Sequence, residues 1–118
     1  MIKDCLFCKI INRELPADIV FENERIIVFK DIRPVAPIHH LIVPKKHITS
    51  VNNIEIEDKE LIGELFLIAK EVADKQSILK QGYRLVINVG QDAGQIIDHL
   101  HLHLLGGAKL STKISERE

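Results

Sequence analysis

Aromatic residues are scarce in this sequence: its 118 residues include no tryptophan, one tyrosine and four phenylalanines. So few rings argue against a surface on which nucleic-acid bases stack. An excess of positive charge is also lacking, because 16 Lys and Arg residues are balanced by 17 Asp and Glu residues, for a net charge of −1. Proteins that bind nucleic acid through its phosphates normally carry a clear basic excess. We therefore expect no nucleic-acid partner.

Long apolar segments are missing as well. The longest apolar stretches, such as residues 65–69, fall far short of the ~20 residues that span a bilayer. The first residues include Asp4 and two cysteines where a signal peptide would have its apolar region. We expect a cytoplasmic protein that does not associate with membranes.

Aliphatic residues are nevertheless abundant enough for a core. Leu, Ile, Val and Phe make up 44 of the 118 residues, about 37%, whereas chains that stay disordered fall below roughly 20%. No internal repeat or Gly/Ser-rich linker divides the chain. The length is that of one compact domain, so we expect a single domain over residues 1–118.

The only two cysteines, Cys5 and Cys8, form a Cys-x-x-Cys pair. In a reducing compartment such a pair indicates metal binding or redox chemistry rather than a structural disulfide. A thioredoxin-like motif would follow a strand, and nothing before Cys5 is long enough to form one. Two thiolates supply half of a tetrahedral zinc site, so zinc binding requires two further ligands. The alternative is that both cysteines pack as small apolar residues.

The pattern of apolar residues predicts a mostly antiparallel sheet. Five segments have the composition of strands: residues 19–22, 25–30, 40–43, 83–89 and 99–105. The first two form a predicted hairpin around Asn23 and Glu24. Prolines at positions 34 and 37 keep residues 31–38 out of a sheet interior, so this segment is predicted to be a loop.

One short and one long helix complete the predicted fold. The short helix covers residues 6–12 and ends before Pro16. The long helix covers residues 58–80, where apolar residues recur at helical spacing and acidic residues occupy the first turn. Gly82 is the expected residue just beyond its end. A sheet with one long helix packed on it is an α+β fold.

Three histidines alternate with leucines near the end of the chain, in His99-Leu100-His101-Leu102-His103. Side chains alternate between the two faces of a strand, so the leucines are predicted to enter the core and the imidazoles to share the other face. Three interpretations remain open from the residues alone. The histidines have no role, two of them bind a catalytic zinc ion, or an imidazole itself carries out the chemistry.

The full run His99-Leu100-His101-Leu102-His103-Leu104-Leu105 resembles the motif of the histidine-triad (HIT) family, and its surroundings resemble the Hint branch of nucleotide-binding purine nucleoside phosphoramidases. Further similar stretches occur in family order: residues 7–11, 29–32, 37–39, 43–47, 82–84, 88, 94–95 and 105–107. The resemblance implies an α+β fold with a five-stranded antiparallel sheet and one long and one short helix. It also implies a homodimer in which two such sheets join.

The activity that the resemblance implies is hydrolysis of a nucleoside 5′-monophosphate joined to an amine through a P–N bond. His101 would attack the α-phosphorus and form a covalent nucleotidyl-imidazole, which water then hydrolyses. A neutral imidazole can act as a nucleophile without a separate base, because its ordinary pKa is about 6.5. His103 would contact the phosphoryl oxygens. His39, in the loop before the third strand, would help to protonate the departing amine.

The resemblance also implies residues that bind the purine nucleotide. Asp31 would accept hydrogen bonds from the ribose hydroxyls, and an apolar slot for the base would be lined by Leu6, Phe7, Ile10 and Ile32. The phosphate would be bound by the Asn88 side chain and by backbone N–H groups of Gly94, Gln95 and Ile96. Relatives often have Ser or Thr where Ile96 stands, a departure from the family pattern.

A structural zinc ion is implied as well. Several prokaryotic relatives hold zinc with residues that correspond here to Cys5, Cys8, His47 and His99. A closed set of four protein ligands leaves no open position for catalysis. We therefore expect a structural, not a catalytic, zinc site.

Three other functions remain to be weighed against this one. The first is a metal-dependent phosphoester hydrolase that uses the triad as zinc ligands. The second is a purine-nucleotide-binding module without catalysis, in which Ile96 marks the lost activity. The third, a dinucleoside polyphosphate hydrolase of the Fhit branch, is disfavoured because the motif continues into Gly106-Gly107 as in the Hint branch.

Overall fold

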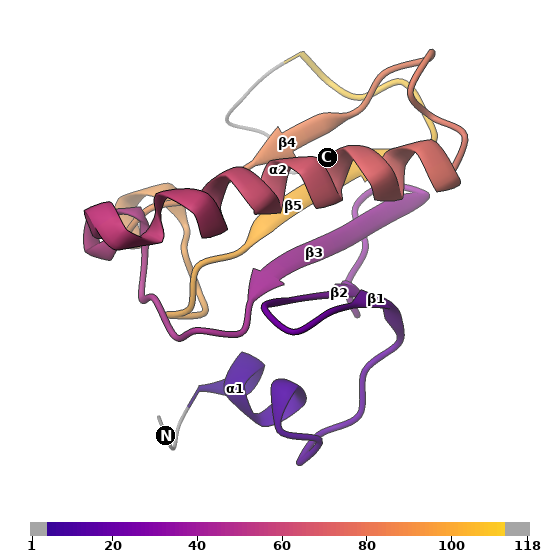
Figure 1. The fold of residues 1–118 in the computed structure, drawn as a ribbon. Helices are drawn as coiled ribbons and strands as arrows, with labels where there is room; N and C mark the ends of the chain where they lie inside the picture. The colour runs from indigo at the N-terminus through magenta and orange to yellow at the C-terminus, as the bar shows by residue number, and fades with distance from the viewer. Residues whose placement is uncertain (1–4, 113–118) are drawn as a thin grey trace.

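A five-stranded antiparallel sheet forms the centre of the structure, a computed structural model that describes residues 5–112 (Figure 1). The strands are β1 (Ile19–Glu22), β2 (Ile26–Lys30), β3 (Ile38–Pro44), β4 (Arg84–Val86) and β5 (Leu102–Gly106). Their order in the sheet is β1-β2-β3-β5-β4. The helices are the short α1 (Leu6–Ile11) and the long α2 (Lys59–Lys75), together with three single 3-10 turns, η1 (Val51–Asn53), η2 (Ile56–Asp58) and η3 (Gln91–Ala93). The predicted α+β class, with one long and one short helix, is confirmed.

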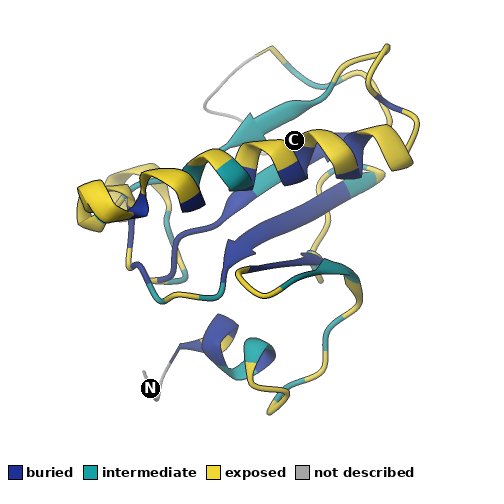
Figure 2. Cartoon of the chain, in the orientation of Figure 1, coloured by how far each residue is buried: buried dark blue, intermediate teal, exposed yellow. Residues whose placement is uncertain are grey.

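The two helices cover opposite faces of the sheet, and the alternation of side chains along the strands creates a core on each face. On the α2 side, Ile42, Leu102 and Leu104 pack against the apolar stripe of the helix. On the α1 side, Phe29 and Leu41 pack against the short helix. Figure 2 shows the same division on α2, whose exposed face points away from the sheet. No helix within residues 5–112 combines the length and apolar character needed to cross a bilayer.

The third strand begins earlier than predicted and includes His39. Ile38 pairs with Gly106, and His39 pairs with Leu105 of β5. The predicted loop therefore ends at Pro37, since the backbone after this proline is free to join the ladder. His39 is consequently held by a central strand rather than by a loop.

The long helix ends at Lys75, five residues before the predicted end. Ser77 adopts a left-handed conformation with φ of 62°, and the Ile78 N–H donates to the Ala73 carbonyl (3.1 Å). This reversal buries Ile78, which is 5% exposed. Burial of this side chain in the core on the α2 side explains why the helix stops before Lys80. Gly82 belongs to the next turn, where its N–H donates to the Ile78 carbonyl (2.9 Å).

The last two strands are shorter than predicted. β5 begins at Leu102, because the preceding segment pairs elsewhere: the Leu100 N–H donates to the Ile48 carbonyl (2.7 Å). His99 and His101 therefore lie just before the strand, whereas His103 lies within it. The leucines still enter the core on the α2 side, as the alternation predicts.

Replacement of Gly107, directly after β5, tests how closely this end of the strand packs against Pro37 and Ile38. The φ of Gly107 is +87°, and an added Cβ would lie 3.1 Å from the Pro37 Cβ. We expect Gly107→Ala to lower the free energy of unfolding by about 1–3 kcal/mol, from left-handed strain and crowding. Gly63→Ala, at an exposed α2 position where a Cβ meets no atom within 4 Å, should instead raise it by about 0.5–1 kcal/mol. Urea denaturation of both variants checks this, and equal effects would contradict it.

Candidate functional site

Two clusters of metal-binding or titratable side chains lie among the described residues. Within each one, the potential ligand atoms all lie within 4.8 Å of one another. We call the first the cysteine–histidine cluster; it comprises Cys5, Cys8, His47 and His99. We call the second the acid–histidine cluster; it comprises Asp31, His39 and His103. His101 lies between them, with its ring centroid 4.9 Å from that of His103.

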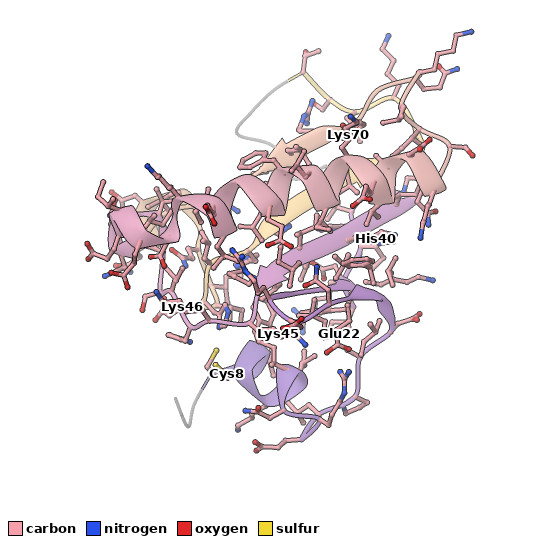
Figure 3. All side chains as sticks on the ribbon, in the orientation of Figure 1. Cys8, Glu22, His40, Lys45, Lys46 and Lys70 are labelled. Atoms are coloured by element: carbon pink, nitrogen blue, oxygen red, sulfur yellow. The ribbon has the colours of Figure 1, made fainter. Side chains whose placement is uncertain are left out.

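The cysteine–histidine cluster joins the start of α1 to the segments that follow β3 and precede β5. The Cys5 Sγ lies 3.3 Å from the His99 Nδ1, and the Cys8 Sγ lies 3.3 Å from the His47 Nδ1. Figure 3 shows Cys8 projecting from α1. Two sulfur and two nitrogen donors are a set that tetrahedral metal sites use. This cluster could therefore hold a metal ion.

Two ion pairs fix the segment that carries His47. Lys45 pairs with Glu22 of β1 (2.7 Å; Figure 3). Lys46 pairs with Asp58 at the start of α2 (2.6 Å). The Asp58 carboxylate also accepts a hydrogen bond from the Glu55 N–H (2.9 Å). The chain before His47 is thus attached to an edge strand on one side and to the long helix on the other.

The ring orientation of His99 suits a metal ligand. Its Nε2 lies 2.8 Å from the Pro44 carbonyl oxygen, which can only accept a hydrogen bond. The proton is therefore on Nε2, and the lone pair of Nδ1 faces the cysteine sulfurs. A ligating histidine typically donates its other N–H in this way. Burial lowers the pKa of His99 to about 4, so the ring is neutral, as a metal ligand must be.

The Cys8 thiol needs a nearby cation in order to ionise at neutral pH. Burial, followed by the hydrogen bond with Cys5, raises the pKa of Cys8 to about 11. Without a cation, the Cys8 thiol therefore stays protonated at neutral pH. A metal ion binding here would displace that proton.

The same reasoning assigns the tautomer of His101. Its Nδ1 lies 2.7 Å from the His99 carbonyl oxygen, so Nδ1 carries the proton and donates it to that oxygen. Burial lowers the pKa of His101, which keeps the ring neutral at pH 7. The Phe7 ring packs edge to face against it, at 5.1 Å and 86°. His101 therefore has a fixed orientation and an available lone pair on Nε2.

His39 and His103 form a hydrogen-bonded pair next to His101. The His39 Nε2 lies 2.9 Å from the His103 Nδ1 and 3.3 Å from the Asp31 Oδ2. Burial lowers the pKa of both rings, that of His103 to about 4. Two neutral rings at this distance share one proton between the facing nitrogens. We call His39, His103 and His101, in that order, the histidine row.

Asp31 lies beside this row rather than apart from it. Its Oδ1 accepts a hydrogen bond from the Arg33 N–H (2.8 Å), and its Oδ2 faces His39. The carboxylate is half-buried. A ligand group bound by Asp31 would therefore lie close to the histidine row.

The predicted phosphate-binding segment is a turn closed by its own backbone. The Gly94 N–H donates to the Gln91 carbonyl (3.0 Å) and the Gln95 N–H to the Gly90 carbonyl (3.1 Å), so both amides are engaged within the turn. Within residues 5–112, the Ile96 N–H and the Asn88 side chain form no hydrogen bond and remain available. Gly94 has φ of +85°, which explains the glycine.

The Gln95 side chain has a role that sequence reasoning missed. Its Nε2 donates to the carbonyls of Thr49 (2.8 Å) and Ile97 (3.0 Å), and its Oε1 accepts from the Gly90 N–H (2.9 Å). All of these partners are backbone groups, so Gln95 ties the turn to the chain after β3. Nothing in the sequence pattern identifies backbone partners, which is why this role went unpredicted.

The residues predicted to line an apolar slot do not share one environment. Phe7 and Ile10 are buried in the core on the α1 side, and Phe7 contacts the rings of His99 and His101. Leu6 is 40% exposed and Ile32 88% exposed. The structure brings the triad, Asp31 and Phe7 together, whereas Ile32 faces solvent.

Comparisons with known proteins agree with this geometry. The family described as "Scavenger mRNA decapping enzyme C-term binding" matches residues 4–117. A purine nucleoside phosphoramidase from Escherichia coli strain K12 is 38% identical over 117 residues, which cover 99% of this chain and 98% of that protein.

Comparison with solved structures also finds HIT family proteins. A HIT family hydrolase from Legionella pneumophila has a TM-score of 0.93 at 46% identity, covering 95% of this chain and 100% of that one. A histidine triad protein from Clostridium difficile has a TM-score of 0.92 at 38% identity, covering 96% and 98%. The match over nearly the whole chain and the agreement between the folds show that this chain belongs to the histidine-triad (HIT) family of hydrolases.

Proposed function

We propose that this chain hydrolyses nucleoside 5′-monophosphate phosphoramidates, with purine nucleotides as substrates and His101 as the nucleophile. The observation that carries the proposal is the hydrogen bond from the His101 Nδ1 to the His99 carbonyl, which leaves the Nε2 lone pair free. The activity in the name of the Escherichia coli relative supports the same reaction. A neutral, oriented imidazole needs no further base in order to attack phosphorus.

The reaction proceeds in two steps. In the first, the His101 Nε2 attacks the α-phosphorus, and the P–N bond to the amine breaks. The electron pair of that bond stays on the amine nitrogen, which receives a proton from the histidine row. In the second step, water attacks phosphorus, the bond to Nε2 breaks and its electron pair returns to the imidazole. The proton lost by water restores the row.

The proton given to the amine comes from a ring N–H of His103, and the proton that water releases in the second step restores it. His39 and His103 are placed for this because their facing nitrogens are 2.9 Å apart. The His103 ring, between His39 and His101, would also contact the phosphoryl oxygens. The Asn88 side chain and the Ile96 N–H would bind the phosphate, and Asp31 would bind the ribose.

The cysteine–histidine cluster is proposed to hold a structural zinc ion. Cys5, Cys8, His47 and His99 would be its four ligands, a closed set whose only contribution is a cross-link between the N-terminal segment and the chain beside the nucleophile. The Nδ1 lone pair of His99, directed at the sulfurs, supports this assignment.

A catalytic metal ion at the acid–histidine cluster is the competing function, and one distance disfavours it. The His39 Nε2 and His103 Nδ1 are 2.9 Å apart, a separation at which one nitrogen donates a proton to the other. A metal ion would require a lone pair on both. This distance does not argue against a nucleotide-binding module without catalysis. The first experiment below distinguishes such a module from an enzyme.

A homodimer is also proposed. β4 is an edge strand of the sheet, and an unpaired edge is a template for a second chain. On α2, the neighbouring residues Phe66 and Leu67 are 43% and 63% exposed, so two large apolar side chains are available to a second chain. Joining two sheets at β4 would leave no open edge there, and the apolar side chains on α2 would offer further contact area to the partner.

The first prediction concerns the nucleophile. Mass spectrometry of wild type, denatured during turnover of an adenosine phosphoramidate, should detect a nucleotidyl adduct on the chain. His101→Ala should show no adduct, and its kcat should fall by at least about 10³-fold, as when other enzymes lose their nucleophile.

The matched control is His40→Leu. His40 is a buried histidine on the α2 side, and within residues 5–112 neither ring nitrogen has a hydrogen-bond partner. This variant should keep both adduct and turnover. Nucleotide binding without turnover in wild type would instead support the non-catalytic module, and turnover by His101→Ala would refute the mechanism.

The second prediction concerns the metal. Purified protein should contain one zinc ion per chain, and Cys8→Ser should lose it. The Tm should fall by about 10 °C or more, since a ligand at 100 times its Kd contributes about 2.7 kcal/mol and each kcal/mol shifts Tm by about 4–8 °C. A chelator should lower the Tm of wild type but not that of Cys8→Ser.

Turnover by chelated wild type, assayed at a temperature where it remains folded, separates the two metal roles. Activity that persists agrees with a structural ion. Complete loss of activity without unfolding would support a catalytic metal instead.

The third prediction concerns the dimer. Light scattering after size-exclusion chromatography should give twice the chain mass for wild type, and Leu67→Glu should shift the protein toward the monomer because it buries a charge in the interface. Ile56→Glu, at a position 83% exposed on η2, is the control and should stay dimeric. A monomeric wild type would contradict the proposal.

A further inference from the structure

The loop between β2 and β3 is closed at its base and stiffened within. The Asp31 N–H donates to the His39 carbonyl (3.0 Å), which joins the two ends of the loop. Pro34 and Pro37 restrict the backbone between them. The conformation of this loop is therefore set by its own bonds and not only by its neighbours.

Two backbone N–H groups of the loop donate hydrogen bonds to side chains of the acid–histidine cluster. The Arg33 N–H donates to the Asp31 Oδ1 (2.8 Å). The Val35 N–H donates to the His39 Nδ1 (3.2 Å). The His39 ring is buried, with 6% of the residue exposed, so water has little access to compete for this nitrogen.

The bond from Val35 assigns the tautomer of His39. A backbone N–H can only donate, so the His39 Nδ1 must present a lone pair to it. Burial lowers the pKa of His39, against the opposing effect of the Asp31 carboxylate, so the ring is neutral and holds one proton. That proton is therefore on Nε2.

The position of this proton decides which ring of the histidine row donates a hydrogen bond and which ring accepts it. The Nε2–H of His39 faces two acceptors, the His103 Nδ1 at 2.9 Å and the Asp31 Oδ2 at 3.3 Å. His103 then accepts at Nδ1 and carries its own proton on Nε2. With the proton of His39 on Nδ1 instead, its Nε2 lone pair would oppose the Asp31 carboxylate and could not donate to His103.

We propose that the Val35 backbone N–H is a positioning group that holds His39 as the Nε2–H tautomer and so directs proton delivery along the row toward the departing amine. The tautomer follows from the contacts above, whereas its role in proton delivery rests on the proposed phosphoramidate hydrolysis. Val35 touches no substrate in this scheme and acts only through His39.

The first test uses the wild-type protein with its natural metal content. Long-range ¹H–¹⁵N NMR of histidine-labelled protein at neutral pH distinguishes protonated from unprotonated ring nitrogens, and His39→Gln assigns the His39 signals. We expect a protonated Nε2 and an unprotonated Nδ1. A protonated Nδ1 would overturn the proposal. This measurement does not depend on activity, so it separates a wrong tautomer from a wrong function.

The second test removes the N–H. Val35→Pro deletes the donor, whereas the control Ala36→Pro places the same ring one residue further on and keeps the Val35 N–H. Val35→Ala keeps the N–H and removes the side chain. An ester linkage in place of the amide at position 35, introduced by chemical ligation, deletes only the N–H and replaces Val35→Pro if the latter does not fold.

Two substrates with the same nucleotide but different leaving groups then distinguish a loss of proton delivery from a general disturbance of the site. An alkylamine leaving group needs a proton, whereas p-nitrophenolate does not. Loss of the N–H should lower kcat about tenfold for the amine substrate, the scale of one buried hydrogen bond, and leave the p-nitrophenyl ester within about twofold. Both controls should resemble wild type. Equal losses on both substrates, or no loss on either, would overturn the role of Val35 in proton delivery.

Discussion

A hydrogen bond between one ring nitrogen and a backbone group is the interaction on which this site depends. His99 donates to the Pro44 carbonyl, His101 donates to the His99 carbonyl, and His39 accepts from the Val35 N–H. Each bond assigns the proton to one nitrogen of the ring and thereby decides what the other nitrogen can do. The partners are main-chain groups of the β2–β3 loop, of the end of β3 and of the segment just before β5, so the assignments are as rigid as the backbone of these segments.

The chemical nature of the backbone partner distinguishes two clusters that otherwise resemble each other. Both contain histidines and potential anionic ligands within a few ångströms. The far nitrogen of His99 meets a carbonyl, so its near nitrogen carries a lone pair for a cation. The far nitrogen of His39 meets an N–H, so its near nitrogen carries a proton. A cation bound at the His39 Nε2 would force that proton onto Nδ1, where the Val35 N–H already points. The first cluster could therefore hold a metal ion, whereas a proton on the His39 Nε2 suits the proton transfer that is proposed for the second.

The sequence predicts this site as a set of residues but not as a set of bonds. Alternation along residues 99–103 correctly separates leucines from imidazoles, because the core on the α2 side accepts only the apolar members. Element ends are less accurate: α2 stops at Lys75 because burial of Ile78 outweighs helical continuation, and His39 joins β3 because Ile38 finds a partner in Gly106. The carbonyl of Pro44, the N–H of Val35 and the backbone partners of Gln95 leave no trace in residue types. Main-chain groups are the same at every position, so only the folded geometry reveals them.

His99 connects the cysteine–histidine cluster directly to His101. Its imidazole lies among the cysteines, while its carbonyl fixes the tautomer of His101 two positions later. The ring is fully buried, and the Pro44 carbonyl at the end of β3 accepts a hydrogen bond from its Nε2. Phe7 strengthens the connection, because its ring packs against both His99 and His101. In the proposed mechanism α1 therefore also helps to hold the nucleophile: Phe7, which anchors α1 to the sheet, packs against the ring of His101.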